Sequence, residues 1–153
     1  LHGRSRRLPR RARPPGARRM IRPGLILVLW LAIALFVLLN DLVGDLWLGP
    51  TLPVRALEWY KTLVPLPYVA MLAIIHARRS AGPRWLEAAL LAALLWSIST
   101  AMLGFVQTRL VYGEDPTLFL DRLGFWWGAP YPLFVVALFA APLLAGAALA
   151  RRR

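Results

Sequence analysis

The 153-residue sequence contains no cysteine, only seven acidic residues against 19 basic ones, and only two histidines. Without cysteine the chain forms no disulfide, thiolate metal site, iron–sulfur cluster or cysteine nucleophile. His76 is the only histidine outside the first 19 residues, and a haem held between helices normally needs two axial ligands. His76 is therefore predicted to be an interfacial residue, and the sequence predicts no cofactor, no metal site and no catalytic residue.

What the sequence has in excess is apolar residues. They make up 59% of the chain, and the mean hydropathy is +0.57. A soluble domain of this size would have too little polar surface to cover them. Residues 25–39 form an uninterrupted apolar run, and with its flanks it covers about 20 residues, or roughly 30 Å of helix, the thickness of a bilayer core. We predict an all-α, integral membrane four-helix bundle with spans at about residues 23–43, 62–78, 85–106 and 130–150.

Residues 1–19 are predicted to be a disordered basic arm because they carry eight of the 19 basic residues and almost no core-forming side chains. Met20 directly precedes the first apolar region. One interpretation is that Met20 is the native start and that the arm is translated upstream sequence. The alternative is a basic arm that binds anionic lipid. Residues 20–153 are then one four-span membrane domain.

Charge predicts how the spans are oriented. If both termini and the turn at 78–84 lie on one side, that side holds seven basic residues without the arm: Arg22, Arg78, Arg79, Arg84, Arg151, Arg152 and Arg153. The other side holds four basic residues and six of the seven acids: Arg55, Lys61, Arg109 and Arg122, with Asp41, Asp45, Glu58, Glu114, Asp115 and Asp121. The positive-inside rule then places both termini in the cytoplasm of a bacterium, in a multi-pass protein of the cytoplasmic membrane.

The two outer loops are predicted to carry short interfacial helices. In the second loop, Asp115 is suited to cap a helix over residues 117–123, and Gly124 is suited to end it. Phe119, Leu120 and Leu123 are expected to dip into the membrane. Residues 55–61 are expected either to form a similar helix or to begin the second span, with a bend at the prolines that follow.

Two rows of small residues, spaced four apart, are predicted to pack the third helix against the fourth. Such rows let helix backbones approach closely in a membrane. The rows are Ala89, Ala93, Ser97 and Ala101 in the third helix, and Ala137, Ala141 and Ala145 in the fourth.

A polar cluster is the candidate functional site, although it contains no recognised catalytic motif. Its members lie in the two outer loops: Asn40, Asp41, Asp45, Arg109, Asp121 and Arg122. Asp41 and Asp45 are one helical turn apart, and such carboxylates repel one another unless a cation or proton relieves them. One interpretation is a solvated rim whose acids pair with Arg55, Arg109 or Arg122. The alternative is a proton or ion site.

Short motifs resemble those of a group of small four-span bacterial membrane proteins. They are Asn40-Asp41, Gly44-Asp45, Leu103-Gly104-Phe105, Val111-Tyr112-Gly113, Leu120-Asp121 and Ala141-Pro142-Leu143-Leu144. Where the resemblance leads us to expect a glutamate between the aromatics of the third helix, the chain has Gly104. Where it leads us to expect an Asp-Tyr-Asn run after the loop helix, the chain has Asp121-Arg122-Leu123. The resemblance therefore implies the four-span architecture and carries no activity with it.

Three functions remain open on these observations. The first is a non-enzymatic structural or accessory membrane protein, or a subunit of a larger complex. The second is a small transporter or channel that forms its pathway by oligomerising, and the third is a lipid-acting enzyme that uses the outer carboxylates. The expected partners are the lipid bilayer and either further copies of the chain or a larger membrane complex, with no nucleic acid.

Overall fold

A computed structural model describes residues 21–110, 113–115, 117–124 and 128–152, and within them the chain is helical with no strand. The all-α prediction is thus confirmed for these residues. The predicted basic arm (1–19), Met20 and Arg153 lie outside the described residues. So do several residues of the second loop, namely Val111, Tyr112, Pro116, Phe125, Trp126 and Trp127.

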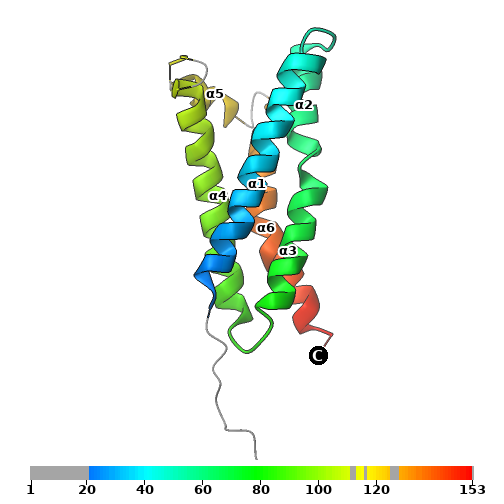
Figure 1. The fold of residues 1–153 in the computed structure, drawn as a ribbon, viewed down its shortest axis with the longest axis vertical. Helices are drawn as coiled ribbons and strands as arrows, with labels where there is room; N and C mark the ends of the chain where they lie inside the picture. The colour runs from blue at the N-terminus through cyan, green and yellow to red at the C-terminus, as the bar shows by residue number, and fades with distance from the viewer. Residues whose placement is uncertain (1–20, 111–112, 116, 125–127, 153) are drawn as a thin grey trace, which may run out of the picture.

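Four rods stand side by side in a bundle (Figure 1). The first is α1 (Pro23–Val43), continued by the π-helix η1 (Gly44–Leu48), and the second is α2 (Val54–Leu63) followed by α3 (Leu66–Arg79). The third is α4 (Trp85–Leu110) and the fourth is α6 (Tyr131–Ala150), with the short α5 (Thr117–Arg122) between them in sequence. Within the described part of the chain, four helices are long and apolar enough to cross a membrane.

The second rod is longer than the apolar run that predicts it, because α2 stands in line with α3 (Figure 1). The interruption falls at Val64 and Pro65, where a proline without an N–H group breaks the ladder of helical hydrogen bonds. The amide of Val64 still donates to the carbonyl of Tyr60, and Val69 donates to Pro65. Residues 55–61 therefore begin the second rod, which was one of the two expected arrangements.

The bundle interior is built from large apolar side chains of α1, α3, α4 and α6. Ile33, Trp96 and Leu138 are completely buried, and the indole Nε1 of Trp96 donates a hydrogen bond of 3.1 Å to the carbonyl of Ile26. In contrast, Leu35 and Met102 expose 60% and 64% of their surface. Exposed apolar side chains along the whole length of a bundle are suited to contact with the hydrocarbon of a bilayer.

The predicted small-residue row of α4 lies on the face that packs along α6. Ala89, Ala93 and Ser97 are buried, and Ala101 is half-buried. On α6 the fully buried row is the neighbouring one, which consists of Phe134, Leu138, Pro142 and Gly146, while Ala137, Ala141 and Ala145 beside it are half-buried.

The row of α6 that contains Gly146 is the buried one because α4 and α6 approach closely at one end of their contact. A Cβ atom on Gly146 would lie 2.7 Å from Cε3 of Trp85 and 3.6 Å from Cβ of Ala89. Because Trp85 fills this space, glycine rather than alanine is required on the face of α6 that meets α4.

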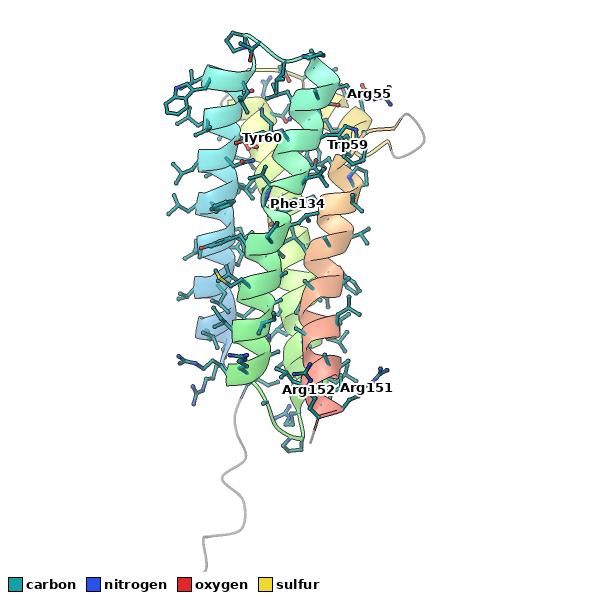
Figure 2. All side chains as sticks on the ribbon, turned by 90° about the vertical axis from the view of Figure 1, so that its right-hand side faces the viewer. Arg55, Trp59, Tyr60, Phe134, Arg151 and Arg152 are labelled. Carbon is teal, nitrogen blue, oxygen red and sulfur yellow. The ribbon has the colours of Figure 1, made fainter. Side chains whose placement is uncertain are left out.

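The two ends of the bundle carry different charges. We call the end with η1, α2 and α5 the acidic end, because all the acids except Glu87 lie there. The other, the arginine end, has the start of α1, the turn 80–84 and the last residues of α6. Figure 2 shows Arg151 and Arg152 at the arginine end, and Arg55, Trp59 and Tyr60 toward the opposite end.

Candidate functional site

A cavity of about 260 Å³ opens between the rods at the acidic end. We call it the acidic-end cavity. Five charged residues line it, namely Asp41, Asp45, Glu58, Lys61 and Arg122. Three aromatic rings, those of Phe119, Tyr131 and Phe134, form part of the wall. The cavity therefore combines ionic groups with an apolar, aromatic surface.

The local structure of the first rod brings Asp41 and Asp45 to this cavity. α1 passes into η1 without a break, and the wider π turn is closed by a hydrogen bond of 2.7 Å from the Gly49 amide to the Gly44 carbonyl. Such π turns are rare and often occur at functional sites. Gly44 is buried there, and a Cβ atom on it would lie 3.1 Å from Cε of Lys61. The missing side chain lets α2 pack directly against the first rod.

Lys61 links the first rod to the second. Its Nζ lies 2.6 Å from Oδ1 of Asp45, and its carbonyl accepts a hydrogen bond of 3.5 Å from Nδ2 of Asn40. Asn40 is buried, so its amide joins the helices and does not face the ligand space. The sequence predicts an arginine (Arg55, Arg109 or Arg122) as the partner of the acids, whereas the ion pair of Asp45 is with Lys61.

Asp41 differs from Asp45 because no hydrogen bond reaches its carboxylate from the described residues. It lies within electrostatic range of Lys61, Asp45 and Arg122. Since Lys61 is already bound to Asp45, the Asp41 carboxylate is available as an acceptor in the cavity.

The position of the Phe119 ring in the aromatic wall depends on contact with Tyr131 and on the space left by Gly104. The Phe119 and Tyr131 ring centroids are 5.7 Å apart in an edge-to-face arrangement. The Tyr131 hydroxyl donates to the Thr100 carbonyl at 3.3 Å. A Cβ on Gly104 would lie only 2.8 Å from Cε2 of Phe119. The missing side chain at Gly104 thus leaves room for the ring of Phe119.

Phe119 also corrects the expectation that it dips into the membrane with Leu120 and Leu123. The phenylalanine is 5% exposed and packs inside the bundle, whereas Leu120 is 60% exposed. The reason is geometric: α5 has a single face that meets α4, and Gly104 leaves room there for a ring.

Three of the six residues of the predicted cluster line one cavity, namely Asp41, Asp45 and Arg122. Asn40 is buried beside the cavity without lining it, whereas Arg109 and Asp121 are exposed and do not line it. Sequence reasoning missed Glu58, Lys61 and Tyr131. Glu58 and Lys61 are three residues apart and so share a face of α2. This spacing is the feature of the sequence from which their common position could have been predicted.

A second cavity, of about 340 Å³, lies toward the arginine end and is lined in part by His76, Ser80 and Trp85. His76, in the last turn of α3, is 1% exposed, so its ring packs inside the bundle, and its predicted interfacial depth stays a prediction. Its Nε2 is 3.2 Å from the Ser80 hydroxyl, and its ring meets Trp96 edge-on at a centroid distance of 6.0 Å. Trp96 therefore lies beside this cavity, one turn before Thr100, which lines the acidic-end cavity.

The described residues contain no group of three histidine, cysteine or acidic side chains placed to hold a metal ion. In the described part of the chain, four helices long and apolar enough to cross a membrane indicate a multi-pass helical membrane protein. Comparison with family models, with curated proteins and with solved structures gives no match to this chain.

Proposed function

We propose that the chain is a multi-pass protein of the bacterial cytoplasmic membrane, with the arginine end in the cytoplasm and α5 near the outer headgroups. The segregation of charge between the two ends supports this orientation, because arginine and lysine accumulate on the cytoplasmic side of membrane proteins. The exposed apolar side chains along the rods are suited to contact lipid.

Within that membrane, the protein acts without catalysis and binds an organic cation in the acidic-end cavity. One observation carries this proposal: the Asp41 carboxylate, without a hydrogen bond from the described residues, shares the cavity with Phe119, Tyr131 and Phe134. A carboxylate together with aromatic faces is the combination that attracts alkylammonium groups. The apolar remainder of the wall is suited to the hydrocarbon part of such a ligand.

The basic residues of the cavity are compatible with a cationic ligand. Lys61 is occupied by Asp45 at 2.6 Å, and Arg122 stands on the exposed face of α5. The described residues of the lining include three acids and two bases, which together have a formal charge of −1. A monovalent cation would make the cavity neutral. This binding role suits an accessory protein or a subunit of a larger complex.

The test uses the full chain purified in a neutral detergent, with benzyltrimethylammonium as the probe. Tryptophan fluorescence is titrated with the probe and, separately, with neopentylbenzene, its uncharged isostere. We expect saturable binding of the cation, and Asp41→Asn should weaken it roughly tenfold or more because the charge contact with a half-buried carboxylate is lost.

Asp121→Asn is the matched control, since it removes the same charge from an exposed residue that does not line the cavity. It should leave the affinity for the probe unchanged. Equal binding of the uncharged isostere, or equal losses in the two variants, would refute the cation site.

An oligomeric transporter is the second candidate, and the two cavities favour it. One cavity lies at each end of the bundle, and the buried side chain of Trp96 lies between them. Liposomes with the reconstituted protein should then take up radiolabelled benzyltrimethylammonium, and Asp41→Asn should abolish uptake. Binding without uptake would leave the accessory role and exclude transport of this probe.

A further inference from the structure

The arginine end has a groove of its own, of about 300 Å³, which we call the basic groove. It lies where the start of α1, the end of α3 and the turn before α4 meet. Arg22, Arg79 and Arg84 line it, one from each of these three segments. None of the described residues that line it is acidic. This groove is separate from the acidic-end cavity, so the inference below does not depend on the ligand proposed there.

One arginine of the basic groove is already neutralised. Arg84 donates from Nε to Oε2 of Glu87 at 2.9 Å, and its Nη2 contacts the same oxygen. Arg22 and Arg79 make no ion pair with any residue in the described part of the chain. Two cations therefore face the groove without a counter-charge from this end of the bundle.

The position of Arg22 is electrostatically unfavourable unless an anion is present. It is the N-cap residue of α1, whose N-terminus has no side-chain cap and no acid in its first turn. The N-terminus of a helix carries partial positive charge, so a cation there is repelled and an anion is attracted. The helix dipole therefore favours Arg79, at the negative C-terminal end of α3, and disfavours Arg22.

We propose that the basic groove binds a phosphate group through Arg22 and Arg79, assisted by the partial positive charge at the N-terminus of α1. Arginine fits phosphate because its planar guanidinium donates two parallel hydrogen bonds. The phosphate comes either from an anionic lipid headgroup or from free phosphate in solution. Exposed Leu27 and Val28, one turn further along α1, would adjoin the acyl chains of such a lipid.

The chain offers a matched pair of variants for this proposal. Arg22→Gln/Arg79→Gln removes two charges from the basic groove, and Arg78→Gln/Arg151→Gln removes two charges from exposed arginines of the same end that do not line it. Both variants keep the pair between Arg84 and Glu87. If Arg22→Gln/Arg79→Gln does not fold, the single variant Arg22→Gln, at an exposed N-cap, replaces it in the same measurement.

The measurement is the thermal unfolding midpoint of the full chain in neutral detergent, followed by tryptophan fluorescence. Dihexanoyl phosphatidylglycerol, dihexanoyl phosphatidylcholine and inorganic phosphate are titrated separately, since a ligand that binds the folded state raises the midpoint. We expect phosphatidylglycerol to raise the midpoint at a lower concentration than phosphatidylcholine. Arg22→Gln/Arg79→Gln should weaken this effect roughly tenfold or more, and Arg22→Gln alone roughly threefold.

The outcomes separate the two sources of phosphate. A response to phosphatidylglycerol without a response to inorganic phosphate supports a lipid site. A response to both supports a site that needs only the phosphate group. No response to either, or equal weakening in the two double variants, would overturn the proposal, because general attraction to the arginine end would then explain the binding.

Discussion

The two ends of the bundle are built in different ways. The acidic end is assembled from short elements, namely η1, α2 and α5, and places charges of both signs beside aromatic rings. The arginine end consists of the ends of long helices joined by one tight turn, and its groove has charge of a single sign. The short elements create a site that mixes charges of both signs with aromatic surface, whereas the helix ends leave a groove that suits an anionic group.

The largest effect is expected where the two ends meet, at Trp96. Trp96→Ala should lower the free energy of unfolding by about 3–5 kcal/mol, because a fully buried indole leaves a cavity between the rods. Its hydrogen bond to the Ile26 carbonyl is lost as well. Chemical unfolding in mixed micelles measures the change. Trp47→Ala is the control: the same truncation at a side chain that is 74% exposed should change stability by less than about 0.5 kcal/mol.

Two glycines compare the packing of the ends directly. Gly146→Ala should lower the free energy of unfolding, because its Cβ would meet Trp85 at 2.7 Å. The clash costs about 1–3 kcal/mol, and the higher helix propensity of alanine offsets roughly 1 kcal/mol of this cost. Gly104→Ala should cost less, since Phe119 lies on the six-residue α5, which can shift. Unfolding midpoints of both variants test this order.

Gly24→Ala is the reference variant for this pair, because no atom lies within 4 Å of an added Cβ there. A larger loss for Gly104→Ala than for Gly146→Ala would show that the acidic end is the more rigid of the two.

The ion pair of the acidic end should contribute less than either packing contact. Lys61→Met keeps the length of the side chain but removes its charge. We expect a coupling energy with Asp45→Asn of about 0.2–1 kcal/mol, because the side chains are 24% and 38% exposed and solvent screens the pair. A double-mutant cycle of unfolding energies measures it. A coupling above about 2 kcal/mol would mean that the pair is desolvated when the protein is in its membrane.

The smallest effect concerns the cap of α5. The backbone amide and the hydroxyl of Thr117 both donate to Oδ1 of Asp115 at 2.9 Å, and these hydrogen bonds lower the pKa of Asp115. A lowered pKa in the folded state stabilises the fold above the ordinary carboxyl pKa of about 4. This stabilisation is lost as the pH falls through the folded-state pKa. Carbon NMR of the Asp115 carboxyl checks it, and Thr117→Val should move its titration upward. Titration of Asp115 at or above the ordinary value would contradict the cap.

Much of the architecture could be predicted from local pattern. The predicted first span, 23–43, coincides with α1, and the fourth, 130–150, differs from α6 by one residue at its start. α4 runs four residues beyond its predicted end at 106, and the second rod begins eight residues before its predicted start at 62. In both cases a helix continues through polar residues after the apolar run ends, and hydropathy does not register that continuation.

The site was less predictable because it depends on contacts between distant segments. Asp41, Asp45 and Arg122 were identified because charges beside an apolar run are conspicuous. Lys61 and Tyr131 were not, since their roles depend on which way α2 and α6 face. Charge alone placed Arg109 and Asp121 in the same cluster, yet both are exposed and neither lines the cavity.

The sequence by itself determined the helical class, the four apolar rods and the separation of charge between the two ends. These properties follow from hydrogen bonds within each helix and from the composition of each segment, and both are local. Only the tertiary structure decided that Gly44 admits α2 and that Gly104 admits Phe119. It also decided that Asp45 holds Lys61 while Asp41 remains available in the cavity. These outcomes depend on the rotation of each helix about its axis, which is fixed by packing against the other helices.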